Sequence, residues 1–157
     1  MAIVLVRIDD RLIHGQVVVG WANYLLANHI VVANDEVAND PTQKMLYEMV
    51  VPPDIKVSIL TIHDAVNAMN RESNHTLRTI LLFTNPRDVL SYLQLGGPVK
   101  CLNIGGMRFE PNKKQIAQAI SVNDEDLTAF RELDKQGVEL EGRAVPTEKS
   151  IDIKKYL

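Results

Sequence analysis

The sequence contains one cysteine, Cys101, so no disulfide can form within the chain. This cysteine lies in the largely apolar run 99–102, which predicts a small buried side chain and not a reactive thiol. No apolar stretch approaches the ~20 residues that a membrane-spanning helix needs, and the start of the chain lacks the pattern of a signal peptide. These absences predict a cytoplasmic protein that would meet a membrane through protein partners.

An excess of positive charge is also missing. The chain has 17 Lys and Arg against 20 Asp and Glu, and its formal net charge at pH 7 is −3. Proteins that bind nucleic acid usually carry a basic stripe, so we expect no nucleic-acid partner. The 157 residues, 46% of them hydrophobic, predict a single domain over residues 1–157 with a substantial core.

The common motifs for nucleotides and metals are absent too. After the first predicted strand the chain has only Gly15 and Gly20, so it lacks the Gly-x-Gly-x-x-Gly pattern of dinucleotide-binding domains, and no Walker phosphate loop is present. No histidine stands four residues from another histidine or a cysteine, as a helical zinc site would require. We therefore expect neither a metal nor a cofactor.

Apolar runs that alternate with amphipathic segments predict an α/β fold. Such a pattern is typical of an open, mostly parallel twisted sheet of about seven strands with helices on both faces. The expected strands cover residues 3–6, 30–33, 56–60, 79–83, 99–104, 119–122 and 138–141, the last of them at an edge of the sheet. The expected helices lie at 16–27, 41–50, 62–69, 86–95 and 124–136, and the end of the chain is expected to dock as a short segment.

Two of these helices carry specific expectations. The first is apolar nearly all round, so Trp21 is expected in the core. Asp40 is a helix cap that precedes a first-turn proline, and the helix that follows has one apolar face. That face consists of Met45, Leu46, Met49 and Val50 and is expected to pack inward.

The most informative segment begins where the first strand ends. Residues 3–6 are apolar and largely β-branched, Arg7 and Asp9 indicate where the strand reaches water, and His14 follows shortly after. In open α/β sheets, ligands and reactive groups gather at the carboxyl ends of the strands. Near pH 7 much of an unperturbed imidazole is neutral, and its free lone pair can attack phosphorus.

The residues around His14 suit the handling of phosphate. An arginine fork fits two phosphate oxygens, and Arg11 is the better candidate than Arg7 because it shares the loop with His14. Asp9 or Asp10 is expected to accept a hydrogen bond from the ring, with Asp10 placed among the catalytic residues and Asp9 at the rim of the site. Backbone amides at a helix start can face an anion, and those expected here belong to Gly15, Gln16 and Val17. The spacing alone fits a solvated loop with surface ion pairs equally well.

Other strand ends extend the candidate site. Thr84 follows the fourth predicted strand, while Asn103, Gly105 and Gly106 lie at the end of the fifth, so all four are expected at its rim. For Asn85, the favoured interpretation is a helix cap without a role in the site. For the two glycines, a simple turn and a role in the site are equally supported. His29, His63 and His75 show no comparable surroundings.

Several segments of the chain also resemble a known protein family. Arg7-Ile-Asp-Asp-Arg-Leu-Ile-His14-Gly-Gln-Val resembles the active-site loop of the IIB component of the mannose/fructose/sorbose-type sugar phosphotransferase system (PTS). Further similar segments follow in the same order at 31–41, 102–107, 113–115, 137–138 and 145–146. The resemblance implies a seven-stranded, mostly parallel sheet and a phosphoryl group carried by His14, whereas the roles of the neighbouring residues are inferred from their chemistry.

In such a system the group comes from a phosphohistidine of a IIA partner and goes to a sugar held by the membrane components IIC and IID. The resemblance therefore implies an exposed His14 on a docking surface. It leaves open whether the sugar is mannose, fructose, sorbose or of the galactosamine type, and the oligomeric state also stays open. The alternative is a regulatory or adaptor module with the same fold and no catalysis.

A response-regulator receiver is the other α/β phosphoprotein to consider. Its acidic pair and its threonine have counterparts in Asp9-Asp10 and Thr84. A receiver also needs an aspartate after the third strand and a lysine after the fifth, where this chain has 60–62 Leu-Thr-Ile and 103–105 Asn-Ile-Gly. The receiver hypothesis is therefore rejected.

Overall fold

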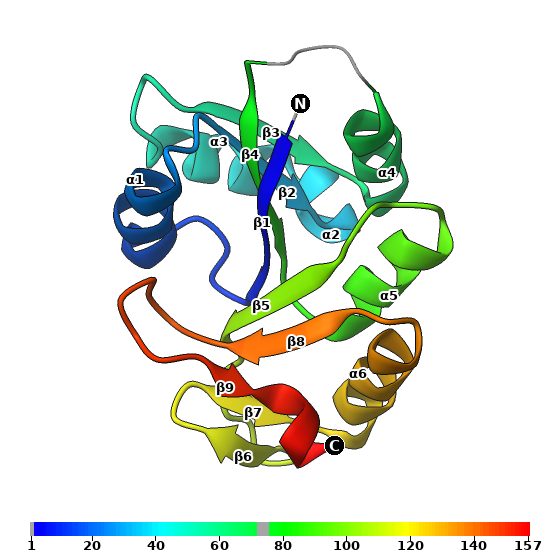
Figure 1. Ribbon diagram of the computed structural model, residues 1–157. Helices are drawn as coiled ribbons and strands as arrows, with labels where there is room; N and C mark the ends of the chain where they lie inside the picture. The colour runs from blue at the N-terminus through cyan, green and yellow to red at the C-terminus, as the bar shows by residue number, and fades with distance from the viewer. Residues whose placement is uncertain (1, 72–75) are drawn as a thin grey trace.

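The computed structural model describes residues 2–71 and 76–157. Seven strands form the main sheet in the order β3-β2-β4-β1-β5-β8-β9. Within this sheet, over the residues described, only the β8–β9 pair is antiparallel. The expected mostly parallel α/β sheet is thus confirmed (Figure 1). The strands are β1 (Ala2–Asp9), β2 (His29–Ala33), β3 (Lys56–Leu60), β4 (Arg78–Phe83), β5 (Cys101–Gly106), β8 (Glu139–Gly142) and β9 (Ile151–Asp152).

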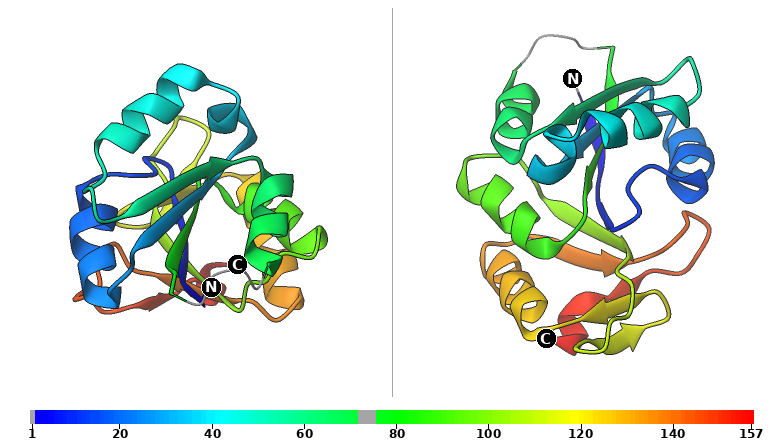
Figure 2. Two further views of the ribbon diagram at one scale, coloured as in Figure 1. Left: turned by 90° about the horizontal axis from the view of Figure 1, so that it is seen from above. Right: turned by 180° about the vertical axis from the view of Figure 1, so that it is seen from behind.

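Helices cover both faces of this sheet, as the view from above shows (Figure 2). One face packs against α4 (Ile62–Asn70), α5 (Pro86–Gln94) and α6 (Asp124–Lys135). The other packs against a π-helical segment, η1 (Gln16–Trp21), which continues into α1 (Ala22–Leu25), and against α2 (Asp35–Ala38) and α3 (Pro41–Met49). A short 3₁₀ helix, η2 (Ile153–Tyr156), ends the chain.

Polar side chains cap the amino ends of several of these helices, as the sequence predicts for Asp40 and Asn85. The side chains of Asp40, Thr61 and Asn85 accept hydrogen bonds from the first-turn amides of α3, α4 and α5. Each bond satisfies a backbone donor that the helix itself leaves unpaired. The favoured interpretation of Asn85 as a helix cap is therefore confirmed.

The membership of the sheet differs from the prediction at its C-terminal side. The expected strand at 119–122 is β7 (Ile120–Val122), which pairs with β6 (Lys114–Ala117) in a separate two-stranded ribbon. The seventh strand of the main sheet is instead β9, so β8 is not the edge strand that its alternating pattern predicts. The docked tail supplies β9 and hides that edge.

The apolar face predicted for α3 is wrong. Met45, Leu46, Met49 and Val50 are all more than half exposed. The helix instead contacts the core through the partly buried Tyr47, so its periodic apolar positions turn outward.

The order of the strands fixes where a ligand site is expected. From β1 the chain moves to β2 on one side, and from β5 it moves to β8 on the other, so the direction of winding changes between the neighbours β1 and β5. Open α/β sheets leave a crevice at the carboxyl ends of such a pair of strands. The loop that carries His14 leaves β1 at this point.

Candidate active site

The loop after β1 is anchored by two apolar side chains. Leu12 and Ile13 are 1% and 4% exposed and pack into the same core cluster as Val17 and Trp21. Leu12 adopts a left-handed backbone conformation with φ of 57°, which costs an ordinary L-residue on the order of 1 kcal/mol. Burial of its side chain offsets that strain, and His14 is thereby held at the start of η1.

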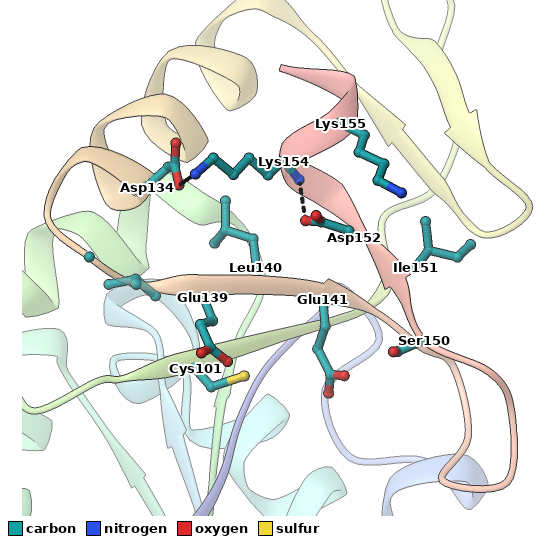
Figure 3. A pocket seen from close by; sticks show the side chains of 12 residues that line it. Cys101, Asp134, Glu139, Leu140, Glu141, Ser150, Ile151, Asp152, Lys154 and Lys155 are labelled. Atoms are coloured by element: carbon teal, nitrogen blue, oxygen red, sulfur yellow. Dashed lines mark hydrogen bonds and ion pairs between the residues drawn. The ribbon is translucent and has the colours of Figure 1, made fainter.

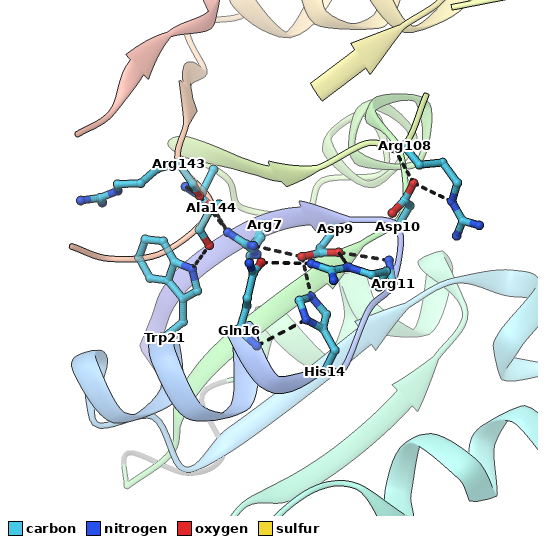
Figure 4. A network of polar contacts seen from close by, with 11 residues as sticks. Arg7, Asp9, Asp10, Arg11, His14, Gln16, Trp21, Arg108, Arg143 and Ala144 are labelled. Carbon is cyan, nitrogen blue, oxygen red and sulfur yellow. Dashed lines mark hydrogen bonds and ion pairs between the residues drawn. The ribbon is translucent and has the colours of Figure 1, made fainter. Parts of the chain in front are cut away.

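Asp9 is the centre of the polar contacts in this loop (Figure 4). Its Oδ2 lies 2.7 Å from His14 Nε2 and accepts a hydrogen bond from Arg7 Nη2 at 3.0 Å. Its Oδ1 accepts one from the backbone N–H of Arg11 at 3.1 Å. The Asp9 side chain is fully buried, so three donors replace the water that this carboxylate gives up.

This contact assigns the proton on the His14 ring. An ionised carboxylate accepts hydrogen bonds and donates none, so the hydrogen of the neutral imidazole lies on Nε2. Nδ1 then keeps its lone pair, and the backbone N–H of Gln16 points to it from 3.4 Å. A Cβ built on Gly15 would meet no atom within 4 Å outside its two chain neighbours, so there is open space next to Gly15. The ring thus keeps one nitrogen with a lone pair that Asp9 does not hold.

Arg11 lies at the surface beside this nucleophile. Its side chain is 55% exposed, against 16% for His14. The guanidinium donates from Nη2 to Gln16 Oε1 at 3.1 Å, and its Nε lies 3.7 Å from Asp9 Oδ1. An exposed guanidinium at this place can bind an anion that approaches His14 from solvent.

Arg7 does not fit the phosphate-binding role that the sequence also suggests for it. Its side chain is fully buried, and Nη1 donates to Asn103 Oδ1 at 2.6 Å and to the Arg143 carbonyl at 3.0 Å. Burial lowers the pKa of Arg7, and the charge of Asp9 opposes that effect. Because its contacts are internal, Arg7 is part of the support beneath the loop.

Asp10 is a second correction. Its Oδ2 accepts hydrogen bonds from the backbone N–H and from Nε of Arg108, at 2.8 and 3.1 Å. Of the two aspartates, it is Asp9 that contacts the ring, and the rim position expected for Asp9 is wrong. Arg108 was missed because 98 positions separate it from Asp10 and no local pattern links them.

The rim residues from β5 do reach the loop, whereas Thr84 has other partners. The Gly106 carbonyl accepts from the Asp10 N–H at 3.1 Å, and Gly105 lies against the guanidinium of Arg7. The Thr84 hydroxyl accepts from the side-chain amides of Asn34 and Asn85. Both glycines belong to β5 itself, so of the two interpretations left open for them the turn is excluded.

Sequence patterns also missed the connection between β8 and β9. The Trp21 ring lies between two cations, with its centroid 5.6 Å from Arg7 Cζ and 5.0 Å from Arg143 Cζ. The indole Nε1 donates to the Ala144 carbonyl at 3.0 Å. At 1% exposure Trp21 is in the core, as expected, and it connects η1 to this distant segment.

His29 lies at the amino end of β2, in contrast to His14. Its two ring nitrogens face the Thr79 hydroxyl at 2.9 Å and the Ser58 hydroxyl at 3.0 Å. Burial lowers its pKa to about 4, and the charge of Lys56 adds to the effect. The ring is therefore neutral at pH 7 and sealed from phosphoryl donors. His63 is exposed beside Asp64, and the expected loop around His75 lies outside the described residues.

The prediction of a buried Cys101 is wrong. Cys101 is exposed at the start of β5, where it lines a hollow of about 660 Å³ with Glu139 and Glu141 (Figure 3). Leu102 points to the buried face, so strand alternation turns Cys101 to the opposite face. Partial burial raises the pKa of its thiol, and both glutamates act in the same direction.

Within residues 2–71 and 76–157, no group of three His, Cys, Asp or Glu side chains is placed to hold a metal ion. None of the helices described there has the length and apolar character to cross a bilayer.

Comparisons with known proteins identify the family of the chain. The family model of the PTS system sorbose subfamily IIB component matches residues 3–157. The fructose-specific EIIB component of Bacillus subtilis (strain 168) is 39% identical over 100% of this chain and 96% of its own length. The mannose-specific EIIAB component of Escherichia coli (strain K12) is 40% identical over 94% of this chain and 46% of its own length. The crystal structure of the IIBSor domain of the sorbose permease from Klebsiella pneumoniae has a TM-score of 0.92 at 42% identity, covering 99% of this chain and 95% of that one.

Proposed function

The chain belongs to the sorbose subfamily of PTS IIB components and carries phosphoryl groups in sugar uptake, and we propose that His14 Nδ1 accepts the group. The observation that carries this proposal is the 2.7 Å contact between His14 Nε2 and Asp9 Oδ2. It leaves the lone pair of the neutral ring on Nδ1, the nitrogen that Asp9 does not hold. The whole of residues 1–157 acts as one such domain.

The donor is a phosphohistidine of a IIA protein or domain. Nδ1 attacks phosphorus in line, a new N–P bond forms, and the N–P bond of the donor breaks with its electron pair left on the donor ring. As Nδ1 becomes bonded, positive charge develops on the imidazole, and Asp9 stabilises it through Nε2. Arg11 and the Gln16 amide stabilise the transferred oxygens.

The phospho-His14 form then docks on the IIC and IID components and passes the group to a sugar hydroxyl. The mannose-specific EIIAB component, of whose length this chain matches 46%, combines A and B in its name, which supports a close association with IIA. We place the protein in the cytoplasm, bound to the transporter through these partners. The sugar is not assigned, since the relatives are named for fructose, mannose and sorbose.

The test is the intact mass of the protein at neutral pH after incubation with phosphoenolpyruvate, the general phosphotransfer proteins and a matching IIA. We expect the mass of one phosphoryl group on the wild type and none on His14→Gln. Acid is avoided because phosphohistidine hydrolyses there. If a phosphorylated IIA that binds the chain transfers nothing, the adaptor alternative replaces this proposal.

A further inference from the structure

We propose that Arg7 is a positioning residue for the nucleophile: its buried guanidinium fixes Asp9 and balances its charge, so that Asp9 holds Nε2 of His14 and leaves Nδ1 as the nucleophile. This inference rests on the proposed role of His14. Arg7 itself touches neither the donor nor the transferred group, because its side chain is fully buried.

The contacts form a chain that ends at the ring. Arg7 Nη2 donates to Asp9 Oδ2, the same oxygen that faces His14 Nε2. The other terminal nitrogen, Nη1, is held by Asn103 Oδ1 and by the Arg143 carbonyl. A planar guanidinium with fixed partners on both nitrogens cannot turn without breaking one of them, so it fixes the orientation of the Asp9 carboxylate.

The space around Arg7 is shaped to its guanidinium. A Cβ built on Gly105 would overlap Arg7 Cζ, so glycine is required there by close approach. On another side the Trp21 ring lies 5.6 Å from the same atom, within the range of a cation–π contact. Arg7 Nε has no hydrogen-bond partner among the described residues and is buried, so the fit comes from its terminal nitrogens and its stacking.

The positive charge of Arg7 also acts on the pair of Asp9 and His14. An isolated carboxylate next to imidazole favours the imidazolium form, which has no lone pair with which to attack phosphorus. Arg7 is a permanent cation 3.0 Å from Asp9, so it offsets the attraction between Asp9 and a proton on His14. The other charged groups around this pair are Arg11 in the same loop, Asp10 with Arg108 at its edge, and Arg143 and Glu148 in the β8–β9 connection.

Two substitutions at Arg7 separate charge from shape. Arg7→Lys keeps the cation and loses the planar fork, whereas Arg7→Gln loses the cation. In Arg7→Gln we expect the acidic limb of the rate–pH profile to move upward by about one pH unit, so that the rate falls about tenfold at pH values well below the limb. In Arg7→Lys we expect the limb to stay in place while the rate falls less. A purely structural role would not move the limb.

The donor for these rates is phosphoramidate, a small molecule that needs no docking surface. Nδ1 forms a bond to its phosphorus, and the P–N bond of the donor breaks, with the nitrogen leaving as ammonia after it takes up a proton. Rates with phosphorylated IIA are measured in parallel. A defect shared by both donors lies in the nucleophile, whereas a defect with IIA alone lies in docking.

Gly105→Ala provides a second variant in case removal of the buried cation prevents folding. The new Cβ displaces the guanidinium, so we expect the rate loss of Arg7→Gln while the arginine is still present. In the Arg7→Gln background the shorter side chain leaves room for the added methyl group, so the second substitution should cost nothing further. Leu133→Ala, in the core of α6, is the control for lost stability, and it should leave the rate–pH profile unchanged.

The ring itself is observed by ¹⁵N NMR of the unphosphorylated chain. In the wild type at pH 7 we expect the neutral form with its hydrogen on Nε2, and in folded Arg7→Gln or Gly105→Ala a larger imidazolium fraction. If both variants kept the wild-type ¹⁵N spectrum of the His14 ring and the wild-type acidic limb of the rate–pH profile, the proposed role of Arg7 would be overturned. Because this readout needs no phosphoryl transfer, it is distinct from a failure of wild-type His14 to accept the group, which would overturn the proposed function.

Discussion

Two histidines lie at opposite ends of the same parallel sheet. His14 follows the carboxyl end of β1, where a fully buried carboxylate binds Nε2 and the His14 side chain stays 16% exposed. His29 begins β2 at the amino end and is enclosed between the hydroxyls of Thr79 and Ser58. The residue type is the same, but one ring is oriented and accessible and the other is satisfied on both sides and sealed.

The difference lies in what each end of the sheet contributes. The carboxyl end combines a loop, a helix start and side chains from β1 and β5, which bring Asp9, Arg7 and Arg11 to one histidine. At the amino end, neighbouring strands supply neutral hydroxyls as partners, and burial together with the charge of Lys56 keeps His29 uncharged. Carboxylate contact and exposure thus mark a reactive histidine more clearly than its residue type does.

Exchange of each histidine for glutamine gives the largest contrast. We expect His14→Gln to abolish phosphoryl acceptance from IIA, because the amide offers no nucleophilic lone pair, and to change the free energy of unfolding by about 1 kcal/mol or less, since one partly exposed hydrogen bond is lost. His29→Gln should accept the group at the wild-type rate. Intact mass measures the acceptance of the phosphoryl group, and urea unfolding measures stability. Acceptance of the group by His14→Gln would contradict the distinction between the two histidines.

Acid should affect the sealed histidine next most strongly. The folded-state pKa of His29 is about 4, below the unfolded value of 6.5, so its contribution to stability is complete above pH 6.5 and is lost as the pH falls toward 4. Between pH 7 and 5 the wild type should lose about 2 kcal/mol more than His29→Gln. Urea unfolding at both pH values tests this, with His63→Gln as the exposed control. Equal losses in wild type and His29→Gln would contradict it.

The exposed arginine of the reactive end gives a smaller effect. We expect Arg11→Lys to slow transfer about tenfold, because a lysine provides a point charge where the fork of arginine binds two phosphate oxygens. The fold should be unaffected, since the side chain is 55% exposed. Arg108→Lys is the matched control, an exposed arginine bound to Asp10 that should leave the rate unchanged. Quench-flow with phosphorylated IIA compares the transfer rates of the two variants. A normal rate in Arg11→Lys would mean that the fork of Arg11 does not bind two oxygens of the transferred group.

The smallest effect is expected at Thr84. Its hydroxyl is bound by Asn34 and Asn85 and makes no hydrogen bond with the His14 loop among the described residues. Thr84→Ala should therefore leave the transfer rate within about twofold of wild type, with a stability loss of about 1 kcal/mol. A large change in rate would mean that the site extends to the end of β4.

The sequence predicts much of this arrangement because the signals are local. Buried β-branched runs and capping residues such as Asp40 and Thr61 locate the strands and helices, and the loop from Arg7 to Gln16 identifies the histidine. The choice between Asp9 and Asp10 is not local: it depends on Arg108, which reaches Asp10 from the segment after β5. The sequence pattern could not say which aspartate would face the ring.

Long-range packing accounts for the other misses. Cys101 is exposed because strand alternation turns it away from the face on which Leu102 is buried, and β8 is interior because the last residues of the chain add β9. The apolar positions of α3 are periodic but turn outward, so periodicity alone did not establish burial. Each miss depends on how segments distant in sequence pack together.

The most direct test of the central claim is the position of the phosphoryl group on the ring. Heteronuclear ³¹P–¹⁵N NMR of the phosphorylated chain, labelled with ¹⁵N in histidine and kept above pH 7, distinguishes the two ring nitrogens. We predict a single phosphorus bonded to Nδ1 of His14, with Nε2 still protonated toward Asp9. Phosphorus on Nε2, or on another histidine, would contradict it.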